Sequence, residues 1–145
     1  MPKPVFTIVD DFYNASWDLA ESLFRLYGNI DEKNALQINV LENETPKPLT
    51  IPAIRQHFQK YADSFLALEG SDLPQDQHLP FMQIEETMNE TILPGLDVLD
   101  EAWQDFNTSA FDYKLLLTGC SHIRIELEQM IIPNAKSMVL ELKPA

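Results

Sequence analysis

The residues that could perform nucleophilic chemistry lie together in one short stretch. Residues 117–126 read LTGCSHIRIE and hold the only cysteine, Cys120, two positions before His122, one of three histidines. A catalytic Cys–His pair needs the two side chains within hydrogen-bond reach. The apolar spacing around them predicts a helix, on which residues two apart do not face each other. We therefore expect Cys120 to be a small buried hydrophobic residue, and no catalytic residue in this stretch.

The other residues that could bind a metal or cofactor lack the necessary spacing. His57, His78 and His122 fall in three separate segments, and the pair Glu85–Glu86 offers at most weak affinity for Ca²⁺ or Mg²⁺. The four glycines are too far apart for a phosphate-binding loop. We expect no metal and no cofactor. A small hydrolase or isomerase with an unmarked carboxylate–histidine site remains an alternative, because a chain with 23 Asp and Glu always offers paired carboxylates.

The distribution of charge is the strongest functional signal in the sequence. The net charge is −13 and the isoelectric point is about 4.4. Residues 61–113 contain twelve Asp or Glu and no Lys or Arg. Nucleic acids and anionic membranes are bound through Lys and Arg, so we expect neither to bind this chain directly. A basic protein is the partner that this charge suits.

An acidic ridge follows if residues 81–106 form one continuous helix. At 3.6 residues per turn, five carboxylates fall within about 100° of one another, opposite the apolar seam. These residues are Glu86, Glu90, Asp97, Glu101 and Asp105. Like charges one turn apart cost a few tenths of a kcal/mol. The ridge is therefore either solvated surface or a docking surface for a basic partner.

We expect an acidic, non-enzymatic interaction module that binds a basic protein through this ridge. Inhibitors, immunity proteins, chaperones and adaptors work in this way. The second alternative is a nucleic-acid mimic, whose carboxylates imitate phosphates in the channel of a DNA- or RNA-binding enzyme. The N-terminus shows no signal-peptide pattern, no apolar run is long enough to cross a membrane, and one cysteine cannot form an internal disulfide. These features predict a cytoplasmic protein.

The elements that position these residues are predicted from apolar side chains spaced three and four apart, the mark of a helix with one buried face. Four such runs cover residues 10–28, 50–70, 81–106 and 109–133. The first has a second stripe, from Tyr13 through Trp17 to Tyr27, which we also expect in the core. Pro94 predicts a kink or break near 93–95, and Pro133 predicts the end of the fourth helix.

Three short segments alternate with the period of a strand instead. They are residues 4–9, 35–41 and 137–142. We therefore predict a single domain spanning residues 1–145, of α+β class but mainly α. About four amphipathic helices pack as a bundle-like core, with a small sheet formed near both termini and by residues 35–41. Surplus apolar residues at Phe111, Leu115 and Ile125 leave room for a homodimer.

Overall fold

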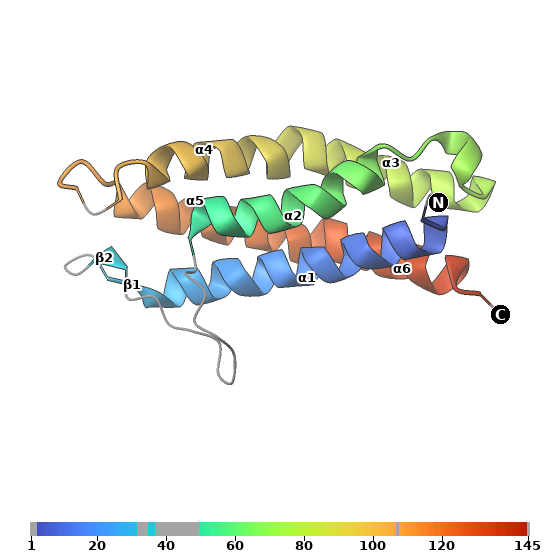
Figure 1. The fold of residues 1–145 in the computed structure, drawn as a ribbon, viewed down its shortest axis with the longest axis horizontal. Helices are drawn as coiled ribbons and strands as arrows, with labels where there is room; N and C mark the ends of the chain where they lie inside the picture. The colour runs from blue at the N-terminus through green and yellow to red at the C-terminus, as the bar shows by residue number, and fades with distance from the viewer. Residues whose placement is uncertain (1–2, 32–34, 37–49, 107, 145) are drawn as a thin grey trace.

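The structure is a computed structural model that describes residues 3–31, 35–36, 50–106 and 108–144. Four long helical rods form an elongated bundle (Figure 1). In chain order the elements are α1 (Val5–Asn29), β1 (Ile30–Asp31), β2 (Ala35–Leu36), α2 (Ile51–Leu66), the 3-10 helices η1 (Gly70–Asp72) and η2 (Gln75–Gln77), α3 (His78–Thr87), η3 (Met88–Ile92), α4 (Leu93–Trp103), α5 (Tyr113–Glu126), η4 (Leu127–Ile131) and α6 (Ile132–Leu142).

The rods run alternately in opposite directions along the bundle (Figure 1). The third rod is α3, η3 and α4 in succession, and the fourth is α5, η4 and α6. Helix α1 packs against α2 on one side and against α5 and α6 on the other, while the α3–α4 rod packs against α2 and the fourth rod. Helix α1 and the α3–α4 rod therefore occupy diagonally opposite corners of the bundle.

The core consists of one predicted apolar stripe from each rod, while the second stripe predicted for the first helix is largely exposed. On the fourth rod the stripe runs through Leu116, Cys120, Ile123 and Leu127, all buried. Between the first two rods, the rings of Phe12 and Phe65 stack with centroids 4.2 Å apart. Thr50 caps the start of α2, because its hydroxyl oxygen accepts a hydrogen bond from the Ala53 amide. The bundle-like core is thus confirmed.

The predicted sheet near the chain ends is wrong, and with it the α+β class. Residues 5–9 form the first turns of α1, and residues 137–142 belong to α6. Val9 and Met138 are fully buried because each continues the 3-4 stripe of its own helix into the core. A short apolar run fits both periods, and the packing of the neighbouring rod decides between them. The fold is a helical bundle.

The third predicted strand is only partly within the described residues. Ala35–Leu36 pairs antiparallel with Ile30–Asp31, with Ile30 opposite Leu36. This two-residue pairing directly follows α1 and involves neither terminus. Residues 37–41 lie outside the described residues.

Two prolines that were expected to interrupt helices are accommodated by π-helices. Pro94 and Pro133 each follow a five-residue π-helical segment, η3 and η4 respectively. In each segment the backbone N–H of the next residue donates five positions back, from Leu93 to Met88 and from Ile132 to Leu127. The wider π turn relieves the clash between a proline ring and the preceding turn. The predicted end of the fourth helix at Pro133 is therefore wrong, and the rod continues to Leu142.

Candidate protein-binding face

The structure separates Cys120 from His122. Cys120 is 1% exposed on the core side of α5, whereas His122 is exposed on the surface. Burial raises the pKa of the Cys120 thiol to about 12, which keeps it protonated and unreactive at neutral pH. The sequence prediction that Cys120 is a buried hydrophobic residue is confirmed.

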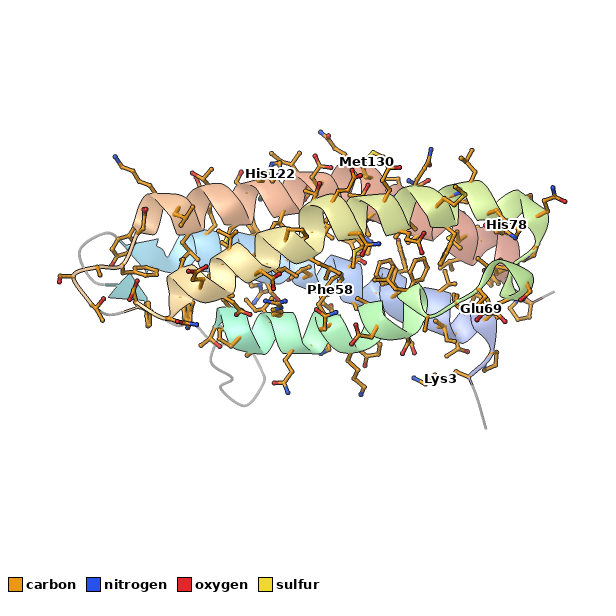
Figure 2. The ribbon with its side chains drawn as sticks, turned by 90° about the horizontal axis from the view of Figure 1, so that it is seen from above. Lys3, Phe58, Glu69, His78, His122 and Met130 are labelled. Atoms are coloured by element: carbon orange, nitrogen blue, oxygen red, sulfur yellow. The ribbon has the colours of Figure 1, made fainter. Side chains whose placement is uncertain are left out.

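The other two histidines have local partners. His57 on α2 lies 3.5 Å from a carboxylate oxygen of Asp18 on α1. His78 lies at the start of α3, where its Nε2 is 2.8 Å from the carbonyl oxygen of Gly70 and thereby ties η1 to the helix. His78 and His122 lie apart on the bundle (Figure 2). Among the described residues, no group of three His, Cys, Asp or Glu could hold a metal ion.

A continuous exposed stripe runs along the outside of the α3–α4 rod, which Figure 2 views from above. We call it the outer stripe, and its members follow one another at intervals of three or four residues. They are Leu79, Met82, Glu86, Glu90, Pro94, Val98 and Glu101, and all seven are exposed. The buried stripe of the same rod repeats the same spacing two positions along, from Phe81 to Leu96. The exposed and buried stripes each keep to their own side of the rod across η3, where their members are four residues apart. This is because a π turn contains about one residue more than an α turn.

Three of the five predicted ridge carboxylates belong to the outer stripe. Glu86, Glu90 and Glu101 are exposed, and within the described part of the chain no Lys or Arg lies within ion-pair distance of them. Among the residues that the structure describes, no fixed cation therefore compensates their negative charge.

The other two ridge carboxylates are placed differently. Asp97 turns toward α2, where Arg55 donates hydrogen bonds both to Asp97 and, at 2.6 Å, to Asp100. Asp105 lies beyond the end of α4, in the turn that follows Trp103. The expectation that residues 81–106 form one helix is thus wrong at its end, because the aromatic stack of Trp103 on Phe106 closes the rod there.

The charge of Arg55, which arginine always carries in proteins, is stabilised by its two acceptors. Burial lowers the pKa of its guanidinium, and the hydrogen bonds and charges of Asp100 and Asp97 more than offset this, so that the pKa lies above its ordinary value. These two interactions of Arg55 join α2 to α4 across the bundle surface. Asp97 thereby has a structural partner that the sequence window 61–113 could not reveal, because Arg55 lies outside it.

Sequence reasoning missed the apolar members of the outer stripe. Leu79, Met82 and Val98 are 65%, 60% and 46% exposed. The sequence spacing could have revealed these three residues, since they extend the three- and four-residue steps of Glu86 and Glu90 in both directions. Leu79 lies outside the run of residues 81–106 in which a helix was predicted, and Met82 and Val98 lie outside the apolar seam of that helix.

The fold and this face define a helical bundle with an acidic, partly apolar outer surface. No family model, curated protein or solved structure matches the chain. Within the described residues, no helix is long and apolar enough to cross a membrane.

Proposed function

We propose that this protein is an acidic, non-enzymatic interaction module that binds a basic protein through the outer stripe. The observation that carries the proposal is that three exposed carboxylates (Glu86, Glu90 and Glu101), with no ion-pair partner among the described residues, share one stripe with exposed apolar side chains. A face that served only to keep the protein dissolved would have no need of Leu79 and Met82 beside these charges. A cytoplasmic setting, in which a lone thiol stays reduced, is part of the same proposal.

The two kinds of side chain have separate roles in this proposal. The carboxylates attract a basic surface from a distance and raise the rate of encounter, an effect that salt screens. The apolar side chains lose their water on contact and slow dissociation. The interleaved apolar residues favour a protein surface with both cations and an apolar patch, and a nucleic-acid-binding channel is a particular case of such a partner.

The first step of the test is to isolate the partner. The full chain, immobilised through its C-terminus, is exposed to native cell extract at low and high salt, beside a variant with Glu86→Gln, Glu90→Gln and Glu101→Gln. The matched control carries Glu126→Gln, Glu128→Gln and Glu141→Gln, which remove the same charge from the fourth rod. A basic protein retained by the wild type and the control, but lost from the outer-stripe variant, is the expected result.

The second step measures association of the isolated protein as a function of salt. The outer-stripe variant is expected to associate about tenfold more slowly at low salt, with a smaller salt dependence, whereas the control keeps the wild-type rate. Met82→Ala is expected to speed dissociation with little effect on association. Equal rates and equal salt slopes for the two triple variants would refute the proposal. Competition by DNA or RNA for the same partner would identify the mimic form of this function.

A further inference from the structure

The aromatic side chains of α1 are exposed where the sequence predicted them to be buried. Trp17, Phe24 and Tyr27 are 47%, 58% and 48% exposed. They belong to the second apolar stripe of α1, in which Tyr13, Trp17, Ala20, Phe24 and Tyr27 follow at intervals of four, three, four and three. This is the spacing of a helix seam that packs against another helix.

The bundle covers one seam of α1 and leaves the second seam half open. The first seam, from Phe12 to Leu26, is fully buried against α2 and the fourth rod. In the second seam only Ala20 is buried, and Tyr13 is half-buried. Three large aromatic rings thus remain in water along a straight rod, which costs free energy in a monomer.

Arg124 on α5 borders this seam. Its guanidinium carbon lies 5.0 Å from the centre of the Phe24 ring, and its buried Nε has no hydrogen-bond partner within the described residues. No carboxylate of the described residues lies within ion-pair distance of it, although the chain has 23 of them. Trp, Tyr and Arg are the residues that most often dominate protein interfaces.

We infer that a second copy of this chain docks on the face formed by α1 and α5, with Trp17, Phe24 and Tyr27 as apolar anchors and Arg124 as the charged contact. Of the three residues that suggested a homodimer in the sequence, Phe111 is buried against Trp103 and Tyr113, whereas Leu115 and Ile125 are exposed.

The charges of the rods favour a second copy over a basic partner at this face. The fourth rod carries equal numbers of both signs: Lys114, Arg124, Lys136, Glu126, Glu128 and Glu141. Helix α1 carries four Asp or Glu. Asp11 pairs with Lys3, Glu21 pairs with Arg25 and Asp18 lies beside His57, while Asp10 has no ion-pair partner within the described residues. In a two-fold arrangement the same patch meets itself, so an antiparallel approach of the two α1 helices brings Asp10 of one copy toward Arg124, beside Phe24, of the other. A basic partner would meet the unpaired cation instead.

The position of the face also suits a dimer. Helix α1 lies across the bundle from α4 (Figure 1), so in such a dimer the outer stripe of each copy stays exposed and far from that of the other copy. The inference therefore does not depend on the proposed function, and its test needs no basic partner.

The test is the mass of the full chain by sedimentation equilibrium at micromolar concentrations. The expected mass is twice 16.6 kDa. Phe24→Asp is expected to weaken dimerisation at least tenfold, and Arg124→Gln to weaken it and reduce its salt dependence. Val98→Asp, the matched change of an exposed apolar residue on α4, is expected to remain dimeric. Circular dichroism checks that each variant keeps its helix content.

A second measurement does not rely on a disruptive substitution. In Trp103→Phe the only remaining tryptophan is Trp17. Its emission is expected to shift to shorter wavelength as concentration rises, because the dimer removes the indole from water. A monomeric wild type, an emission that is independent of concentration, or a Phe24→Asp variant that dimerises as well as Val98→Asp would overturn the inference.

Discussion

At the scale of single residues, burial and neighbouring charges decide what the reactive groups can do. Cys120 and Arg55 both show this. The thiol of Cys120 lies in the core and keeps its proton. The guanidinium of Arg55 is held between Asp97 and Asp100, so part of the acidic charge on α4 serves to join α4 to α2. Side-chain identity alone suggests a nucleophile and an uninterrupted ridge, and the neighbours of each residue alter both interpretations.

The raised pKa of Cys120 predicts a stability that falls in alkaline solution. Below pH 9.0, the ordinary thiol pKa, folded and unfolded chains both keep the proton. The contribution of the buried thiol to the free energy of unfolding is then fully present. As the pH rises toward about 12, the unfolded chain loses the proton and the folded chain does not. Relative to Cys120→Ala, the wild type should lose about 1.4 kcal/mol of unfolding free energy per pH unit above this point. Urea unfolding between pH 8 and pH 10 measures this, and parallel pH profiles would contradict it.

At the scale of elements, close contacts fix how the third and fourth rods pack. Gly119 on α5 faces Leu99 on α4, and a Cβ built on Gly119 would lie 2.6 Å from the Leu99 Cδ2 atom. Gly95 faces Ile123 in the same interface. These glycines weaken the helices locally, and in return they allow the backbones to approach. The two π-helices on these rods likewise let the helices continue through Pro94 and Pro133 with their buried stripes in phase.

Alanine at Gly119 is expected to destabilise the bundle, although alanine favours helices. The gain in helix propensity is about 1 kcal/mol, and forcing a methyl group against the buried Leu99 costs about 1–3 kcal/mol. Gly28 is the matched control, since it lies in α1 with no atom within 4 Å of an added Cβ. Gly28→Ala should therefore stabilise the protein by up to about 1 kcal/mol. Urea unfolding of both variants measures the difference, and a stabilising Gly119→Ala would show that the rods separate readily.

At the scale of the whole molecule, the charge is unevenly distributed. The α3–α4 rod carries six Asp or Glu and no cation, whereas the fourth rod carries three of each sign. Arg55 compensates only the edge of the α3–α4 rod that faces α2. The outer stripe therefore has a strong negative field, and the opposite corner has exposed aromatic rings. The two proposed interfaces differ in chemistry for this reason.

Neutralising the outer stripe should stabilise the isolated protein at low salt. The combined change of Glu86, Glu90 and Glu101 to Gln removes mutual repulsion and is expected to raise the unfolding free energy by about 1 kcal/mol. The same change at Glu126, Glu128 and Glu141 should have a smaller effect, since cations lie on that rod. Thermal or urea unfolding across salt concentrations measures both. The gain should vanish at high salt, and a gain that persists would contradict an electrostatic origin.

The sequence by itself determined the four amphipathic helices, the buried position of Cys120 and the acidic character of the α3–α4 rod. These follow from spacing and composition, which are local properties. Only the tertiary structure decided the period of residues 4–9 and 137–142, the course of the rods through Pro94 and Pro133, and the pairing of Asp97 with Arg55. It also decided that Trp17 and Phe24 are exposed. Each of these depends on which rod lies alongside, and that contact joins residues far apart in the chain.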